Sequence, residues 1–352
     1  MERQDKDLAF MLRYENVAWY DEGEVRVLDR RVYPQKIEWV ICRSVLDVAA
    51  AIRGMVTQST GPYTLAPMGM ALAAYLVRDR SFEETKSFLE QASLTISSSR
   101  PTTKKRMADL TERCIPVALK ALEEGRRADE AVRDYVVEMN DSRYARVDKI
   151  AHYLVDKFPM GGKVMTQCYA ETVLGLMLRE ARRRNNPIKL FCPETRPFFQ
   201  GARFTSTVCC EMGFDVTLIT DNMPAYVMAN EKVDIFTCAA DAISCDGYVF
   251  NKVGTSQIAI SANYFGVPVY VTGAPDKGHP THDSVTIEMR NPDETLYAMG
   301  VRTAVEGVKG YYPAFDMTPP ELITGIVTNK GIFRPEEVNN YFKDNAPVEL
   351  TV

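Results

Sequence analysis

Beyond Gly161-Gly162 the chain consists of short apolar runs that alternate with helix-like segments. The apolar runs occupy residues 163–166, 188–191, 215–219, 233–238 and 267–271. Helical patterns separate them at residues 171–184, 200–212, 223–229 and 257–265. A strand that is repeatedly followed by a helix predicts parallel strands whose sheet is covered by helices on both faces. The sequence therefore predicts an α/β fold for this part of the chain.

The N-terminal part has a different pattern. Residues 17–28 alternate apolar and polar side chains around Gly23, which is typical of a β-hairpin with a glycine turn. The segment from Ser81 to Glu84 has the form of a capping box, which predicts the start of a helix. Longer helical patterns cover about 102–124 and 128–158.

With 352 residues and 39.6 kDa the chain is long enough for two domains. We expect a hairpin and helical domain over residues 1–150 and the α/β domain over residues 151–352. The net charge of −5 argues against nucleic acid as a partner, because such binding needs clustered positive charge. No apolar run approaches the ~20 residues of a membrane span, and residues 1–7 are too polar for a secretion signal. We therefore expect a cytoplasmic protein with no membrane contact.

Cysteine and histidine usage predicts no metal site. None of the eight cysteines forms a Cys-x-x-Cys pair, and several lie inside apolar runs, which is typical of reduced, buried thiols. The three histidines have no ligand spacing with the cysteines. No Gly-x-Gly-x-x-Gly or phosphate-loop lysine motif is present, so no nucleotide cofactor is expected either.

Two reactive side chains follow predicted strands. Asp241 comes after the run 233–238, and Cys168 comes after the run 163–166. Open α/β sheets bind ligands at the carboxyl ends of their strands. Taken alone, Asp241 could begin a loop or cap a turn, and Cys168 could be an inert buried thiol. Together they predict a functional site at this edge of the sheet.

Several motifs are similar to those of one known family. They lie at residues 194–203, 221–223, 240–241, 251–255 and 313–319. In this order they resemble the 5-methylthioribose 1-phosphate isomerase family. That family shares its fold with ribose 1,5-bisphosphate isomerase and with the α, β and δ regulatory subunits of the exchange factor of translation initiation. The resemblance covers nearly the whole chain, and it implies a Rossmann-like catalytic domain, no cofactor and a homodimer.

The resemblance also implies roles for particular residues. Cys168 matches the family's catalytic cysteine, and Asp241 matches its catalytic aspartate. The residues that would hold the sugar phosphate are Arg100, Gln200, Asn251, Lys252 and the loop at Thr60 and Gly61. The chain departs from the family pattern at Gln58, where the first phosphate-contacting loop usually has an arginine. Glutamine lacks the bidentate donor that arginine offers to a phosphate.

Further departures lie close to the catalytic positions. Gln167 and Tyr169 flank Cys168 where the family has histidine and asparagine, and Tyr312 replaces an asparagine. The hairpin and the segment from Gly300 resemble the methylthioribose branch. The sequences after Asp241 and after Gly254 are closer to the bisphosphate branch.

These residues could isomerise a sugar that is phosphorylated on its anomeric oxygen. Such a sugar cannot open its ring spontaneously, so the enzyme must help break the ring C–O bond and move a hydrogen from C2 to C1. Asp241 would serve the ring oxygen, since burial would raise its pKa and keep it protonated near neutral pH. Cys168 would exchange the proton at carbon, with Lys252 as a source of nearby positive charge. We expect Cys168 and Asp241 to lie on adjacent strands and to face one pocket, which Gln200, Asn251 and Lys252 would also line.

The leading hypothesis is thus an aldose–ketose isomerase that acts on 5-methylthioribose 1-phosphate or a close relative such as 5-deoxyribose 1-phosphate. A ribose 1,5-bisphosphate isomerase is an alternative within the same superfamily. A non-catalytic, sugar-phosphate-sensing regulatory subunit is an alternative of a different class.

Overall fold

The computed structural model describes residues 3–100 and 104–343. The chain divides into two compact units, residues 1–145 and 146–352. Each unit has its own hydrophobic core. Among the described residues, no helix combines the length and the apolar character that a membrane span requires.

The first unit contains the predicted hairpin. Strands β1 (Ala18–Asp21) and β2 (Glu24–Leu28) are antiparallel, and β3 (Trp39–Cys42) extends them to a three-stranded sheet. Gly23 in the turn has φ +90°, a conformation that glycine adopts without steric cost. Two short helical segments precede the hairpin, η1 (Phe10–Leu12) and α1 (Tyr14–Val17).

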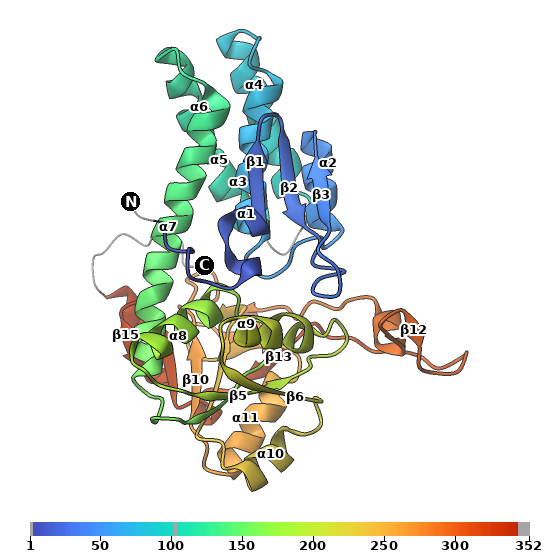
Figure 1. The fold of residues 1–352 in the computed structure, drawn as a ribbon, viewed down its shortest axis with the longest axis vertical. Coiled ribbons are helices and arrows are strands. Elements are labelled where there is room, and N and C mark those ends of the chain that lie inside the picture. Colours follow the sequence, from blue (N-terminus) through green and yellow to red (C-terminus); the bar gives the residue numbers. More distant parts are fainter. Residues whose placement is uncertain (1–2, 101–103, 344–352) are drawn as a thin grey trace. The chain divides into compact units, whose positions relative to one another are not determined.

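Helices make up the rest of this unit (Figure 1). They are α2 (Val45–Arg53), α3 (Pro62–Leu76), α4 (Phe82–Ser97), α5 (Lys104–Glu112), α6 (Cys114–Glu123) and α7 (Ala128–Val155), which continues into the second unit. The capping box is confirmed, because the Ser81 hydroxyl accepts from the Glu84 N–H and the Glu84 carboxylate accepts from the Ser81 N–H.

The prediction of a single helix over 102–124 is wrong. Its first two residues lie outside the described residues, and the rest forms two helices that meet at Arg113. Pro116 lies in the first turn of α6, where its missing N–H cannot bond the carbonyl of Glu112. The backbone therefore ends one helix and begins another.

The second unit is built on a seven-stranded sheet in the order β15-β14-β10-β7-β4-β5-β6. The strands are β4 (Lys163–Met165), β5 (Lys189–Pro193), β6 (Asp215–Ile219), β7 (Ile235–Ala239), β10 (Val269–Thr272), β14 (Gly325–Thr328) and β15 (Gly331–Phe333). All neighbouring strands pair in parallel except β14 and β15. The predicted Rossmann-like parallel sheet is confirmed.

Helices cover both faces of this sheet. Helix α8 (Thr172–Arg183) and the segment formed by η3 (Gly201–Thr205) and α9 (Ser206–Glu211) lie on one face. Helices α10 (Pro224–Glu231) and α11 (Thr255–Tyr264) lie on the other (Figure 1). The inner strands β7 and β14 are almost entirely buried, as in most parallel sheets, whereas the edge strand β6 is largely exposed.

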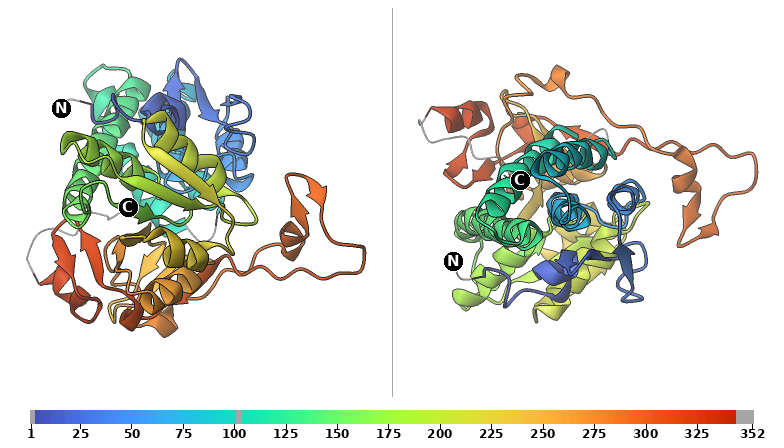
Figure 2. Two further views of the ribbon diagram at one scale, coloured as in Figure 1. Left: turned by 60° about the horizontal axis from the view of Figure 1, so that its bottom comes forward. Right: turned by 90° about the horizontal axis from the view of Figure 1, so that it is seen from above.

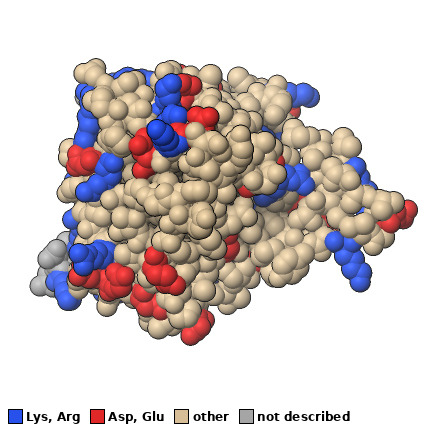
Figure 3. All heavy atoms as spheres, turned by 90° about the horizontal axis from the view of Figure 1, so that it is seen from below, with Lys and Arg blue, Asp and Glu red and all other residues tan. Residues whose placement is uncertain are grey.

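The second unit also contains a smaller, separate sheet. Strands β8 (Ala242–Ile243), β9 (Val249–Lys252) and β13 (Phe315–Thr318) are antiparallel in the order β13-β9-β8. Between β10 and β13 the chain forms an arm that extends away from the sheet, with η5 (Pro292–Leu296), β11 (Tyr297–Ala298) and β12 (Val301–Arg302) (Figure 2). The remaining short helices are η4 (His282–Ser284), η6 (Pro320–Leu322) and η7 (Pro335–Phe342). On the face shown in Figure 3, acidic and basic side chains are interspersed in small groups.

Candidate active site

Cys168 lies three residues beyond the end of β4. Its φ of +57° is uncommon for a residue other than glycine, and such backbone strain is often found at functional sites. The Cys168 N–H donates to the Thr195 hydroxyl at 3.2 Å, and its carbonyl accepts from the Thr205 hydroxyl. Thr195 is held in turn by Asp221, which accepts from its N–H at 2.8 Å. The motifs at 194–203 and 221–223 thus fix the backbone that carries the thiol.

Asp241 lies two residues beyond the end of β7. Because β4 and β7 pair directly, Asp241 and Cys168 follow adjacent strands, as predicted from the sequence. The Asp241 N–H donates to the Phe250 carbonyl at 2.9 Å, which anchors the bend to the small sheet. The predicted burial of the Asp241 side chain is wrong. The residue is exposed and lies in a bend after the end of β7.

Asn251 and Lys252 lie in strand β9 and are both buried. The Asn251 side chain donates to the Thr255 hydroxyl at 3.0 Å, and the Lys252 ammonium donates to the Ala314 carbonyl at 3.0 Å. The ammonium also lies 5.0 Å from the centre of the Phe315 ring. Burial lowers the pKa of Lys252, since desolvation disfavours the charged form.

Gln200 immediately precedes η3, which is a π-helical turn. It is 6% exposed, and its side-chain carbonyl oxygen has no hydrogen-bond partner among the described residues. A buried acceptor without a partner is costly, so a ligand or water that donates to it would be stabilised here. π-helical turns are frequent at functional sites.

Burial and nearby charges both shift the pKa of the Cys168 thiol. Burial raises its pKa to about 11, the positive charge of Lys252 acts in the opposite direction, and the negative charge of Asp241 raises it further. The thiol is therefore protonated at neutral pH. The predicted influence of Lys252 on Cys168 is present in the structure.

Sequence reasoning assigned no role to Arg290 or Tyr312. The Arg290 N–H donates to the Tyr312 carbonyl at 3.0 Å, and its guanidinium donates to Glu288 at 2.9 Å. The positive charge of Arg290 lowers the pKa of both Cys168 and Lys252. Arg290 is therefore part of the same cluster of interacting charges. Tyr312 is 2% exposed, and the positive charge of the Arg290 guanidinium acts on its hydroxyl. The available signal was the position of Tyr312, directly before the recognised motif at 313–319.

Asp316 holds the turn between β9 and α11. Its carboxylate accepts from the N–H groups of Gly254 at 2.7 Å and of Ser256 at 3.1 Å. Gly254 has φ +105°, which favours glycine at this position. Burial raises the pKa of Asp316 to about 6, although both N–H groups favour the ionised form.

Three other predicted site residues belong to the first unit. Thr60 and Gly61 form the turn before α3, where the Gly61 N–H donates to the Gln58 carbonyl at 3.0 Å. Arg100 follows the end of α4. Their role in substrate binding stays a prediction.

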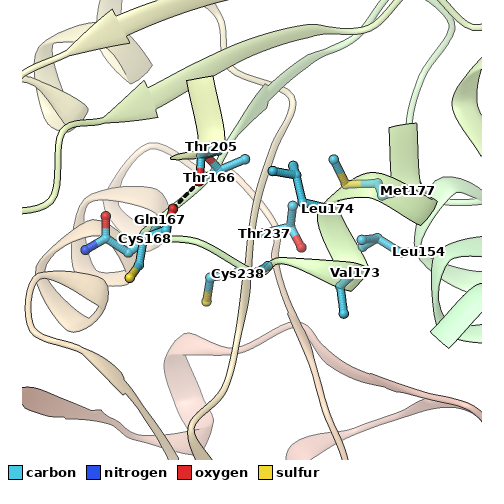
Figure 4. A pocket seen from close by; sticks show the side chains of 11 residues that line it. Leu154, Thr166, Gln167, Cys168, Val173, Leu174, Met177, Thr205, Thr237 and Cys238 are labelled. Atoms are coloured by element: carbon cyan, nitrogen blue, oxygen red, sulfur yellow. Dashed lines mark hydrogen bonds between the residues drawn. The ribbon is translucent and has the colours of Figure 1, made fainter. Parts of the chain in front are cut away.

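A pocket opens beside Cys168 within the second unit (Figure 4). Among the described residues its lining consists of Leu154, Thr166, Gln167, Cys168, Ala170, Val173, Leu174, Met177, Thr205, Thr237 and Cys238. Asp241, Gln200, Asn251 and Lys252 do not line it, so this pocket differs from the shared pocket that we predicted. No group of three or more His, Cys, Asp or Glu side chains in the described part of the chain could hold a metal ion.

The fold and the site define an α/β protein in which polar side chains gather at the carboxyl ends of a parallel sheet. Residues 64–335 match the initiation factor 2 subunit family, and the chain belongs to this family. The superfamily predicted from the motifs is therefore confirmed.

Similar proteins include named isomerases. A methylthioribose-1-phosphate isomerase from Chloroflexus aurantiacus is 34% identical over 334 residues, covering 90% of this chain and 95% of the relative. A 5-deoxyribose 1-phosphate isomerase from Clostridium botulinum is 32% identical over 347 residues, covering 94% and 96%.

Two solved structures have the same fold. The 5-methylthioribose 1-phosphate isomerase from Pyrococcus horikoshii OT3 has a TM-score of 0.79 and 29% identity, with 93% of this chain and 94% of that chain covered. Subunit delta of the translation initiation factor eIF-2B from A. fulgidus also has a TM-score of 0.79, with 31% identity and coverage of 92% and 96%.

Proposed function

We propose that this protein is a cofactor-independent aldose–ketose isomerase. Its substrate would be 5-methylthioribose 1-phosphate or a close pentose 1-phosphate such as 5-deoxyribose 1-phosphate, and its product the corresponding ribulose 1-phosphate. The observation that carries this proposal is the placement of Cys168 and Asp241 after the adjacent strands β4 and β7. Similarity to named isomerases over nine-tenths of the chain supports it.

The reaction needs one proton carrier at oxygen and one at carbon. The protonated form of Asp241 gives its proton to the ring oxygen while the bond between this oxygen and C1 breaks. The thiolate form of Cys168 takes the C2 hydrogen as a proton, which leaves an enol phosphate with a C1–C2 double bond. Cys168 then returns this proton to C1, and the C2 hydroxyl gives its proton to Asp241 as the C2 ketone forms. Both groups end in their starting states, so no oxidant or reductant is consumed.

The neighbouring residues would hold the substrate. Lys252 is a buried cation that would attract the phosphate on C1. The unpartnered side-chain oxygen of Gln200 could accept from a sugar hydroxyl. Asn251 adjoins Lys252 on β9. By the family resemblance, Arg100 and the turn at Thr60 and Gly61 are further candidates for contacts with the phosphate.

The test is an isomerase assay on a panel of pentose 1-phosphates, with the ketose product detected directly. Cys168→Ser and Asp241→Asn should each lower turnover by about 10² or more, as expected for the loss of a general acid–base group. Matched controls are Cys210→Ser and Asp283→Asn, at exposed positions, which should keep full activity. Circular dichroism would show that all variants are folded. Full activity in both site variants would overturn the assigned roles.

A non-catalytic sensor of sugar phosphates is the second candidate. It is favoured by the fold shared with subunit delta of eIF-2B and by Gln58 in the first loop. Protein that is inert on the whole panel, yet binds a sugar phosphate in calorimetry, would favour this candidate. A ribose 1,5-bisphosphate isomerase would instead prefer the bisphosphate in the same assay. The homodimer expected from the resemblance belongs to the proposal in all these cases.

A further inference from the structure

The Lys252 ammonium is buried but has no carboxylate in contact with it. Lys252 is 4% exposed. Among the described residues, its ammonium contacts the Ala314 carbonyl at 3.0 Å, the Phe315 ring at 5.0 Å and the Tyr312 ring at 5.8 Å. A buried charge is costly unless it has partners. One carbonyl and two aromatic rings therefore carry most of the local stabilisation of this cation.

Tyr312 is the ring of this pair that stands outside the small sheet, and no step of the proposed reaction uses it. Its ring centre lies within the range over which the face of an aromatic ring attracts a cation. The ring packs against Phe198, with 6.2 Å between the ring centres. The Tyr312 carbonyl accepts from the Arg290 N–H at 3.0 Å. Side-chain packing and backbone pairing thus both hold the ring in place.

The register of β13 on β9 brings Tyr312 to Lys252. Phe315 pairs with Lys252 across these two strands. The Ala314 carbonyl accepts from the Lys252 ammonium and also from the Val253 N–H at 3.2 Å. Tyr312 lies two residues before Ala314, so the same backbone that binds the ammonium also carries the ring.

Resting on the proposed function, we propose that Tyr312 is a positioning residue whose ring holds the Lys252 ammonium beside Cys168 without cancelling its charge. A carboxylate in the same place would also hold the ammonium, but its negative charge would oppose the attraction of Lys252 for any other anion. An aromatic ring attracts the cation through its quadrupole and has no net charge. The ammonium therefore keeps its attraction for the Cys168 thiolate and for the phosphate on C1.

Two cations act on Cys168, and only one of them is paired with a carboxylate. The Arg290 guanidinium donates to Glu288 at 2.9 Å, whereas Lys252 has the contacts described above. Of these two cations, Lys252 lowers the pKa of the Cys168 thiol more strongly. Arg290 lowers the pKa of Lys252, while Cys168, Asp241 and Glu288 raise it. A change in the charge of Lys252 should therefore be visible at the thiol.

Alkylation of Cys168 reports this charge without any need for isomerase activity. Its rate with iodoacetamide is followed against pH and compared with the rate of the fully ionised thiol. Tyr312→Leu should lower the thiolate fraction at pH 9 by about threefold or more, because Lys252 loses its proton more readily without the ring. Tyr312→Phe keeps the ring and should stay within about twofold of the wild type. The matched control is Tyr311→Leu, the same change at a neighbouring residue that is 76% exposed, which should leave the profile unchanged.

A double-mutant cycle separates positioning of Lys252 from a general effect of packing. In a Lys252→Met background, Tyr312→Leu should cause no further change in the pH profile, because the charge is already absent. An equal change in both backgrounds would overturn the inference, since the ring would then act on the thiol without Lys252. If circular dichroism shows that Tyr312→Leu is unfolded, Tyr312→Met fills the space with a flexible side chain and has the same expected result.

The isomerase assay separates the inference from the function on which it rests. Tyr312→Leu should raise KM for the pentose 1-phosphate by about tenfold, and Tyr312→Phe should restore it. Wild-type protein that is inert on every sugar, yet shows the expected alkylation profiles, would overturn the isomerase and support the role of the ring. An active enzyme whose folded Tyr312→Leu variant keeps the wild-type KM and pH profile would overturn only the inference.

Discussion

Alkylation of Cys168 should depend on pH in a way that reports its surroundings. Burial raises the pKa of this thiol from 9.0 to about 11, and only the thiolate reacts with iodoacetamide. With a pKa of about 11, the thiolate fraction rises about ninefold between pH 9 and pH 10. With the ordinary value of 9.0, the rise over the same interval would be less than about twofold.

The assay follows loss of the unmodified Cys168 peptide by mass spectrometry, with N-acetylcysteine as a free reference thiol. Lys252→Met should slow the reaction at pH 9, because the positive charge of Lys252 lowers the pKa of Cys168. Alkylation of the wild-type protein that levels off near pH 9 would refute the reasoning. The kcat/KM of the isomerase should follow the same curve if the thiolate takes the C2 proton.

Two further predictions concern stability. The pKa of the Asp316 carboxyl is about 6 in the folded protein, whereas its ordinary value is 3.8, so the folded state binds the carboxyl proton more tightly than the unfolded state. The unfolding free energy should therefore fall by about 1 kcal/mol as the pH rises from 5 to 7. Asp316→Asn should remove this part of the pH dependence in urea titrations, and an unchanged dependence would contradict it. A Cβ added at Gly201 would lie 1.8 Å from the Pro193 carbonyl oxygen, so Gly201→Ala should lower the unfolding free energy by about 1–3 kcal/mol or more. Gly54→Ala, whose nearest atom is the Ala50 carbonyl oxygen at 3.1 Å, should cost less, and equal losses would refute the clash.

The strands of the parallel sheet could be predicted where burial on both faces produces a continuous apolar run. Strand β7 is such a case, since four of its five residues are buried. Strand β14 is equally buried but was not predicted. It begins with Gly325 and ends with Thr328, so its apolar run shrinks to Ile326 and Val327. Two apolar residues are too few for a periodic signal.

Strand β9 was missed for a different reason. Its second half, Asn251 and Lys252, is polar, and the sequence equally fits a turn before α11. The structure buries both side chains because Thr255 and the Ala314 carbonyl accept their hydrogen bonds. The Ala314 carbonyl is far from Lys252 in sequence, and the bond from Asn251 to Thr255 forms only when the turn between them folds. The local sequence pattern therefore could not reveal either partner.

The site itself was predicted in part. Its placement at the ends of β4 and β7 follows from the alternation of strands and helices. The exposure of Asp241 and the position of Arg290 do not follow from it. Arg290 lies in an irregular segment with neither helical nor strand periodicity, and its backbone and side chain reach Tyr312 and the neighbourhood of Cys168 through pairing that the sequence pattern does not reveal.

The sheet order has a consequence for folding during synthesis. Strands β4 and β7 are neighbours in space, yet about 70 residues separate them along the chain, and such non-local pairing makes folding slow. Until β7 has been synthesised, β4 can pair only with β5, and its other edge stays open. An open apolar edge is a template for pairing with other chains. Nascent chains that end before Ile235 should therefore be the most prone to aggregate and the most dependent on chaperones.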